Sequence, residues 1–355
     1  MALIVAPGSA AQTIRRPRLR VLVDGVVAGS ALDARVVSNN YYSADWFHVS
    51  LVAAESGPFS LSYWSSVKRP LIEIQSMVTE STAPKSMILG YADSVGIDTR
   101  RKVVRVDGRD LSALMVDSCL HEVFPNYAAD AIISVIALRH GLNPKVISTA
   151  GLAGRMFGGE QLETGLSQYA RASTDWDLVV RLAQRAGHDV YVEGRDFYFQ
   201  PSGAKKDQVI QISQDDVTDL MLERNLVTSL PEAIFVSSWN SQGQQAFSSG
   251  PSGAGVSYQY GIAPNMSAGQ IAQTVGQYMA ATEAYARSIE ITMPGELEIT
   301  ARSRIALQGT GTDFDRSYDI ECIDRTFSPL SGFHQRIRAR QVSDIPMGLV
   351  RSLVT

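Results

Sequence analysis

The stretch "LQGTGTDFDRSYDIECIDRTFSPLSGFHQRIRARQ", residues 307–341, has the pattern of two β-strands joined by a turn. Its start looks like a phosphate-binding loop, because Gly309 and Gly311 flank a threonine. A phosphate loop also needs a third glycine, a lysine and a following helix, and the sequence has none of these here. We therefore interpret the two glycines as a strand-to-strand turn.

Three arginines on the second of these strands are the candidate functional residues. Arg336, Arg338 and Arg340 alternate with Ile337 and Ala339, so we expect the three guanidinium groups on one face of the strand. This face is either a solvated charged surface or a surface that meets acidic groups of a neighbouring subunit through bidentate contacts. The sequence leaves both interpretations open.

The composition is that of a folded protein with two or three domains. Hydrophobic residues make up 45% and charged residues 19% of the 355 positions. The formal net charge of -4 argues against a general nucleic-acid-binding protein. Cys119 and Cys322 form no CxxC pair, and we expect both to be buried, reduced thiols of a protein assembled in a cytosol. No apolar run approaches the ~18 residues of a membrane span, so we expect no membrane insertion.

The hydrophobic period divides the chain into a β part, an α/β part and a second β part. Alternating strand patterns come first, and the clearest helix of the middle part begins at a Thr174 cap and ends at Gly187. The polar stretch 241–255 is expected to be a mobile loop. The predicted parts are a flexible N-terminal arm (1–17), a first β domain (18–105), an α/β middle domain (106–204), a second β domain with an inserted helix at 267–287 (205–345), and a C-terminal tail (346–355).

The sequence contains no assembled catalytic or metal-binding motif. A serine hydrolase would show GxSxG at a strand-to-helix turn, and "GPSGAG" does not fit that pattern. Two carboxylate pairs, Asp175/Asp177 and Asp313/Asp315, are interpreted as residues of a helix start and of a turn. We therefore predict no enzyme activity, no catalytic residue, no metal and no cofactor. The histidines, which share no metal-ligand spacing, are His48, His121, His140, His188 and His334.

Three stretches in the same order resemble the central hub proteins of phage-type baseplates. That family includes late control protein D of contractile phages and the head region of the VgrG proteins of type VI secretion. "VVRVDGRDLSALMVDS" (103–118) resembles the element that closes the first barrel of the family. "STDWDLVVRLAQRAGHDVYVEGRDFYF" (173–199) is similar to its tryptophan-containing helix and hairpin. "MPGELEITARSRIALQGTGTDFDRSYDIECIDRTFSPLSGFHQRIRAR" (293–340) resembles its closing element, with a "PG" turn and a final hairpin containing "GF".

The resemblance implies a fold that is mainly β with an α/β insertion. Two β-barrels related to the tail-tube fold, over 18–105 and 205–345, would flank the mixed α/β middle domain. Three subunits would form a ring of six barrels, which adapts a hexameric tail tube to a trimeric central spike and has no enzymatic activity. The implied partners are two further copies of the chain, the tail tube protein, the central spike protein, and baseplate wedge or other tail proteins. A contact with the tape measure protein is left open, and no specific nucleic acid is implied.

The resemblance also implies a location in the tail baseplate of a virion, after assembly in the cytoplasm of a host bacterium. Arg336, Arg338 and Arg340 are then candidate contacts with a subunit or with the tube. VgrG chains continue into spike domains that this sequence lacks, so we expect the spike to be a separate polypeptide. Two other functions stay open, a tail-associated peptidoglycan or carbohydrate hydrolase and a carbohydrate-binding adhesin module. The aromatic residues that suggest the adhesin are Trp46, Trp64, Trp239 and Tyr258–Tyr260.

Overall fold

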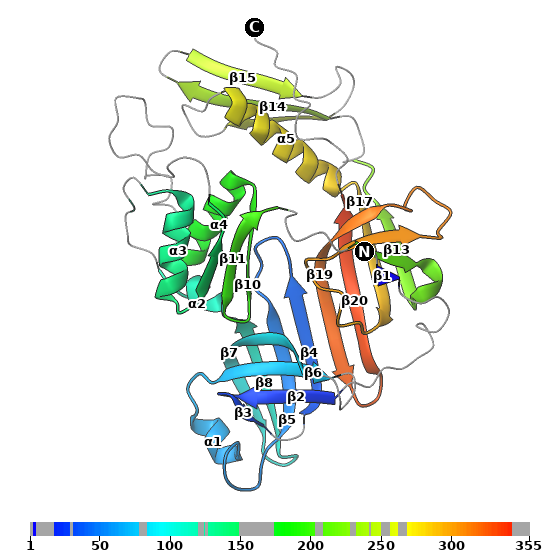
Figure 1. Ribbon diagram of the computed structural model, residues 1–355. Helices are drawn as coiled ribbons and strands as arrows, with labels where there is room; N and C mark the ends of the chain where they lie inside the picture. The colour runs from blue at the N-terminus through cyan, green and yellow to red at the C-terminus, as the bar shows by residue number, and fades with distance from the viewer. Residues whose placement is uncertain are drawn as a thin grey trace.

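The protein is mainly β, with one large sheet, two small sheets and a few helices (Figure 1). Among the residues that the structure describes, the large sheet has 14 strands and each small sheet has 3. This bears out the predicted fold class, mainly β with an α/β insertion. The computed structural model describes residues 3–4, 18–28, 31–77, 84–119, 124, 127–148, 174–202, 209–227, 232–240, 243–249, 256–261 and 268–342.

The first lobe is the part of the large sheet built from residues 18–110. Its strands follow the order β3-β2-β6-β7-β8-β5-β4, and alternate side chains are buried, as in β6. Asp24 and Gly25, with φ of 50° and 82°, form the turn of the β2–β3 hairpin that the sequence indicates. The elements are β2 (Arg18–Val23), β3 (Val26–Val27), β4 (Ala31–Asn39), β5 (Trp46–Val52), α1 (Leu61–Ser66), β6 (Leu71–Met77), β7 (Lys85–Asp98) and β8 (Val103–Asp110).

The second lobe contains the last hairpin of the sheet. β20 pairs with β19 and β17, and β13 extends β17 on its other side. On the other edge of β19, β18 and β12 continue the sheet to β1. The elements are β1 (Leu3–Ile4), β12 (Val209–Ser213), the 3-10 helix η2 (Gln214–Asp216), β13 (Asp219–Arg224), β17 (Arg287–Pro294), β18 (Arg304–Gln308), β19 (Ser317–Ser328) and β20 (Gly332–Gln341).

One strand pair joins the two lobes into a continuous sheet. β4 runs antiparallel to β19, from the pair Cys322↔Asn39 to the pair Phe327↔Ala34. The end of the last hairpin also enters the core of the first lobe, where the rings of Phe327 and Phe333 stack with centroids 4.2 Å apart. The lobes are therefore joined by backbone pairing and by a shared apolar core.

The glycine turn at the start of β19 is a structural turn, as the sequence predicts. Gly309 and Gly311 have φ of 85° and 66°, a conformation that glycine adopts without strain. The Asp315 carboxylate accepts hydrogen bonds from the Thr310 N–H at 3.0 Å, the Thr310 hydroxyl at 2.7 Å and the Gly311 N–H at 3.2 Å. The carboxylate therefore accepts hydrogen bonds from the turn itself, which fits the interpretation of Asp313/Asp315 as turn residues.

The α/β unit lies beside the second lobe and above the first in Figure 1. Helix α4 begins after Thr174, whose hydroxyl accepts a hydrogen bond from the Asp177 N–H, and ends at Gly187 with φ of 65°. Both capping predictions are confirmed. The helices share a core with the buried side of the β10–β11 hairpin. The elements are α2 (Ala113–Val116), α3 (Ala129–Arg139), β9 (Asn143–Val146), α4 (Asp175–Ala186), β10 (His188–Glu193) and β11 (Asp196–Pro201).

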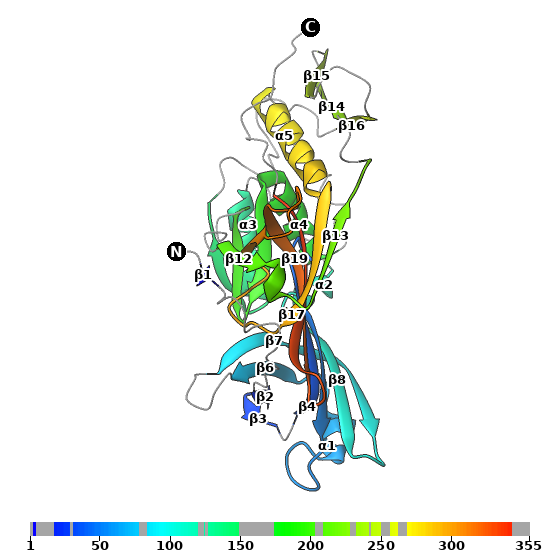
Figure 2. The same ribbon diagram turned by 90° about the vertical axis from the view of Figure 1, so that its right-hand side faces the viewer.

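An insertion between β13 and β17 corrects the prediction for residues 243–249. The stretch 232–240 has the pattern of a strand, and 241–255 was expected to be a mobile loop. The strand is confirmed as β14 (Glu232–Asn240), whereas the loop is wrong for 243–249, because β14, β15 (Gly243–Ser249) and β16 (Val256–Gly261) form a separate sheet covered by α5 (Ala268–Ala284). Residues 241–242 and 250–255 lie outside the described residues. Polar composition hid β15, whose backbone is ordered by antiparallel pairing with β14. Figure 2 shows that this insertion lies at the end of the molecule opposite the first lobe.

The predicted domain limits stay predictions, although some elements cross them. β8 continues past residue 105 to Asp110, and Leu3–Ile4 of the predicted arm pair in parallel with β12. The rest of the arm and the tail 346–355 lie outside the described residues. In the part of the chain that the structure describes, no helix is both long enough and apolar enough to span a membrane.

Candidate interaction face

The three predicted arginines lie on β20, with their side chains directed away from the core of the second lobe. Ile337 and Ala339, which alternate with them, are buried in that core. The side chains of Arg336 and Arg338 are 54% and 58% exposed. Strand alternation therefore predicts their orientation correctly.

Arg336 and Arg338 share one carboxylate of the neighbouring strand β17. Glu290 lies directly opposite Arg338 in the sheet, 2.9 Å from its Nε atom and 3.4 Å from the Nε atom of Arg336. The hydrogen bond from Arg338 to Glu290 raises the pKa of that guanidinium. Two positive charges against one negative charge leave this exposed strip with a net positive charge, which a further carboxylate can neutralise.

Arg340 has a different environment, although it shares the strand face. It is only 8% exposed, and its guanidinium carbon lies 4.0 Å from the ring centroid of Tyr41 and 4.3 Å from that of Tyr285. An Nη atom of Arg340 donates to Glu321 Oε1 at 2.7 Å. The guanidinium group of Arg340 is thus packed between two tyrosine rings and hydrogen-bonded to a carboxylate of the same chain. These contacts stabilise the fold, so Arg340 is not equivalent to the other two arginines.

The polar face continues from β20 across β19 and β4 into the first lobe. In one row of directly paired residues, Arg336 lies opposite Asp324, and beyond Val37 the row reaches Trp46 and Arg109. In the adjacent row, Arg35 lies opposite Thr326 on one side and His48 on the other. We call this surface the outer face, defined by the outward side chains of β17, β20, β19, β4, β5 and β8.

A chain of hydrogen bonds on the outer face has the residue types of a hydrolytic triad. His48 Nδ1 is 2.7 Å from Asp107, and His48 Nε2 is 3.4 Å from the Ser50 hydroxyl. The Ser50 hydroxyl, however, donates to Asp33 at 3.1 Å, and Ser50 is only 5% exposed. β5 is paired on both sides, so its backbone N–H groups serve the sheet and cannot stabilise an oxyanion. The arrangement fits a polar surface network and lacks an accessible nucleophile.

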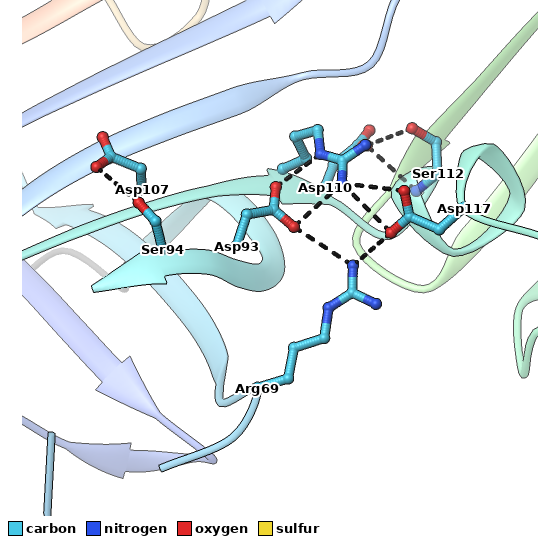
Figure 3. Close-up of polar contacts among 8 residues, drawn as sticks. Arg69, Asp93, Ser94, Asp107, Asp110, Ser112 and Asp117 are labelled. Atoms are coloured by element: carbon cyan, nitrogen blue, oxygen red, sulfur yellow. Dashed lines mark hydrogen bonds and ion pairs between the residues drawn. The ribbon is translucent and has the colours of Figure 1, made fainter. Parts of the chain in front are cut away.

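A second network ties β7, β8 and the end of α2 together at the edge of the outer face. Figure 3 shows a guanidinium group between Asp93 and Asp117, with Arg69 reaching the same two carboxylates from below. Arg109 Nε donates to Asp93 at 2.6 Å, and Arg69 donates to Asp117 at 2.9 Å. The hydrogen bond from Arg109 is the main reason why the pKa of Asp93 is lowered. Two cations and two anions neutralise each other, so this network holds strands together and offers no free charge.

The tryptophans and cysteines singled out in the sequence lie in different environments. Trp64 is buried in the first lobe, whereas Trp46 is 36% exposed on the outer face, where the Arg35 guanidinium carbon lies 5.1 Å from its ring centroid.

The expectation of buried cysteines is wrong for Cys119, which is exposed, while burial raises the pKa of the half-buried Cys322. The side chain of Trp239 lies outside the described residues. Within the described residues, no group of three or more His, Cys, Asp or Glu side chains could hold a metal ion.

Sequence reasoning missed the acidic half of the outer face. Asp324 and Glu290 pair with arginines on neighbouring strands, and neither shares a motif with its partner. Their alternation with buried residues was visible, since Ile323 and Ile289 are core residues. Only the strand register, which depends on long-range pairing, shows which charges meet.

The fold matches those of solved phage tail proteins. The tail protein from Neisseria meningitidis MC58 superposes with a TM-score of 0.67 and 11% identity, over 92% of this chain and 97% of that one. The 43 kDa tail protein of prophage MuSo2 from Shewanella oneidensis gives a TM-score of 0.67 and 13% identity, over 93% and 100%. The chain has the fold of a phage tail protein.

A type VI secretion component shares this tail-protein fold. The E. coli protein, described as structurally similar to the bacteriophage T4 tail proteins gp27 and gp5, gives a TM-score of 0.58 and 11% identity, over 94% of this chain and 80% of that one. No protein-family model matches the sequence, and no curated protein sequence matches it. The tail-protein fold is therefore recognised from three-dimensional structure, at sequence identities that establish the fold alone.

Proposed function

We propose that this chain is the structural hub of a phage tail baseplate or of a related contractile injection system. Three copies form a ring that adapts a hexameric tail tube to a trimeric central spike. The observation that carries the proposal is the pair of β lobes joined edge to edge by β4 and β19. Two lobes per chain give six in a trimer, so one ring can present six lobes to the tube and three equivalent surfaces to the spike.

The free edges of the sheet favour assembly. In the described part of the chain, β13 pairs with β17 alone, which leaves the backbone groups of its other edge without a strand partner. Met221 on β13 is 63% exposed, and Leu226 and Val227 just after the strand are 69% and 57% exposed. An unpaired edge beside exposed apolar side chains is unfavourable in an isolated subunit and favourable in a closed ring.

The other proposed contacts follow from the outer face. Arg336 and Arg338 outnumber the one carboxylate, Glu290, with which they are paired, and they are the proposed contacts with a neighbouring subunit or with the tail tube protein. The central spike and the wedge proteins are proposed partners at the remaining surfaces. The proposed location is the tail baseplate, and the proposed role is non-enzymatic, since the His48 network has no accessible nucleophile.

The oligomeric state of the purified chain tests the proposal. Native mass spectrometry is expected to give a species of three chains, and negative-stain electron microscopy is expected to show a ring with six lobes. A monomer at micromolar concentration, alone and with the tail tube protein, would contradict the hub. Zymography on peptidoglycan tests the hydrolase alternative, and a lytic band that is lost in His48→Ala would establish that alternative.

A further inference from the structure

A cavity of about 420 Å³, lined by both apolar and charged side chains, lies where the first lobe, the α/β unit and the second lobe meet. Residues of β7 and β8 line it from the first lobe, and the β10–β11 turn lines it from the α/β unit. The segment 297–303 and β19 line it from the second lobe. A volume of this size is within the range of ligand-binding cavities in proteins.

Two arginines of the second lobe line this cavity, and their hydrogen bonds within the described residues go to uncharged acceptors. Arg325 is 5% exposed and donates one hydrogen bond, to the carbonyl oxygen of Ile299, while its Nε atom is buried with no partner. Arg302 donates to the Asn40 side chain, and its guanidinium carbon lies 3.9 Å from the ring centroid of Tyr191. A buried guanidinium that lacks an acceptor is costly, and a bound anion would remove that cost.

The acidic residues of the cavity do not fill this need. Asp45 accepts a hydrogen bond from the Asn39 N–H at 2.6 Å, and Asp110 accepts one from the Ser112 N–H at 3.2 Å. Among the described residues, the side-chain hydrogen bonds of Arg302 and Arg325 go to Asn40 and to the Ile299 carbonyl oxygen, and neither goes to Asp45 or Asp110. Asp45 attracts both guanidinium groups through space without a hydrogen bond to either, so their N–H donors stay available to a further acceptor.

The charges that line the cavity favour an anion at neutral pH. Burial, together with the negative charge of the neighbouring Asp45, raises the pKa of Asp110 to about 8, so Asp110 is largely protonated at neutral pH. The positive groups of the lining are then Lys85, Arg302 and Arg325, and the negative ones are Asp45 and Glu193. Because Lys85 is paired with Glu298 at 3.3 Å, the two guanidinium groups are the cations available to an anion. The ionisable lining residues are Lys85 on β7, Arg302, Arg325 on β19, Asp45, Asp110 on β8 and Glu193 on β10.

We propose that this cavity is a binding site for a small oxyanion, a carboxylate or phosphate group that bridges Arg302 and Arg325. The site goes beyond the proposed hub function and does not depend on it. Arginine forms bidentate hydrogen bonds with both kinds of group, and the Arg325 Nε atom supplies a donor that the protein itself leaves unused. A bound oxyanion connects the second lobe to the cavity wall formed by the α/β unit and the first lobe.

Thermal unfolding of the full chain with added anions tests the site. Sodium malonate and inorganic phosphate are titrated separately against sodium chloride at matched ionic strength. A saturable rise in Tm with malonate alone assigns a carboxylate, a rise with both assigns a general oxyanion site, and a rise with phosphate alone assigns a phosphate. A shift that equals that of chloride in both series overturns the proposal.

Two variants locate the bound anion in the cavity. Arg302→Met is expected to weaken binding by about tenfold or more, because a charge-assisted hydrogen bond is lost. Arg304→Met is the matched control, since Arg304 pairs with Asp319 and does not line the cavity. If Arg325→Met folds, as judged by circular dichroism, it loses binding as well. Unchanged binding in Arg302→Met would overturn the assignment, whatever the outcome for Arg325→Met.

The pH dependence of malonate binding is an independent check. Affinity is expected to fall between about pH 7 and about pH 9, as Asp110 ionises and the lining loses its net positive charge. In Asp110→Asn this fall should disappear. An affinity that stays constant over this range in the unsubstituted chain would contradict the role of Asp110, and together with unchanged binding in Arg302→Met would exclude the site.

Discussion

Arg35 and Asp324 form a bidentate ion pair across the one strand pair that joins the two lobes in the described part of the chain. Arg35 Nε is 2.9 Å from Asp324 Oδ1, and its Nη2 is 2.6 Å from Oδ2. Arg35 belongs to β4 of the first lobe and Asp324 to β19 of the second, so the charges connect the same two strands as the backbone hydrogen bonds. The pair reinforces the register of the joint between the lobes.

A double-mutant cycle on Arg35→Ala and Asp324→Ala should give a coupling free energy of about 1 kcal/mol. That is the upper end for exposed pairs, and it is expected here because the geometry is bidentate and Asp324 is only 21% exposed. The coupling should shrink at high salt. Urea unfolding of the four proteins measures it. A coupling near zero would mean that backbone pairing alone fixes the joint.

Arg340→Met should lower the free energy of unfolding by about 1–3 kcal/mol, because it leaves Glu321 without its cation and removes the contact with two tyrosine rings. Arg338→Met is the matched control on the same strand and the same face. Its side chain is 58% exposed, so its effect should stay within about 0.5 kcal/mol. If both variants lowered the free energy of unfolding by the same amount, the packing of Arg340 between the tyrosine rings would contribute nothing to stability.

Arg336→Gln combined with Arg338→Gln should weaken assembly without unfolding the subunit. The double change removes the two positive charges beside Glu290, and Glu290 is exposed enough to be solvated. Size-exclusion chromatography with mass analysis, at low and at high salt, measures the fraction of the chain that is assembled into the ring. The control is Arg100→Gln with Arg101→Gln in the β7–β8 turn, which has the same charge change on another surface. Assembly like that of the unsubstituted chain would leave the two arginines as a solvated surface.

The helices and the last hairpin could be predicted because their signals are local. The Thr174 cap, the Gly187 end and the alternation from Arg336 to Arg338 all depend on residues that are close in sequence. The burial of Arg340 could not be predicted, because Tyr41 and Tyr285 come from distant parts of the chain. The strand β15 was missed for a similar reason, since its pairing with β14 overrides a polar composition.

The cavity at the joint was missed because nothing in the sequence links its residues. Asp110 lies in the "GRD" stretch that carries the family resemblance, but the stretch gives no sign that the carboxyl group is buried beside Asp45. Burial of this kind results from the packing of three parts of the chain, each of which has an ordinary local pattern. Composition and spacing predicted the fold class, and only the assembled structure showed where charge is left unpaired.

Asp110 should make the protein less stable as the pH rises. Its pKa is raised from 3.8 to about 8 in the folded state, so the folded protein holds a proton that the unfolded chain releases. The stabilising effect is complete below about pH 4 and is lost as the pH rises toward about 8. In Asp110→Asn the decline of Tm over this range should become flatter, while the acceptor for the Ser112 N–H is kept.

Asp315→Asn is the control for this experiment, because the pKa of Asp315 is shifted in the opposite direction to that of Asp110. Hydrogen bonds from Thr310 lower the pKa of Asp315, so its contribution is present above the usual carboxyl range and is lost only as the pH falls. The Asp315→Asn variant should therefore change Tm above the acid range and leave the slope toward pH 8 unchanged. A slope in Asp110→Asn that equals that of the unsubstituted chain would contradict the assigned titration.

Gly295→Ala should destabilise the joint between the lobes by about 1–3 kcal/mol through overpacking. A Cβ atom at Gly295 would lie 2.2 Å from a ring carbon of Phe333, and that ring is held by stacking on Phe327. Gly276→Ala in α5 is the matched control, because its added Cβ meets no described atom within 4 Å and a helical alanine is favoured by about 0.5–1 kcal/mol. In urea unfolding, Gly295→Ala should therefore lower the free energy of unfolding and Gly276→Ala should raise it. A neutral Gly295→Ala would mean that Phe333 moves freely, and the shared core would then hold the lobes less tightly than their packing indicates.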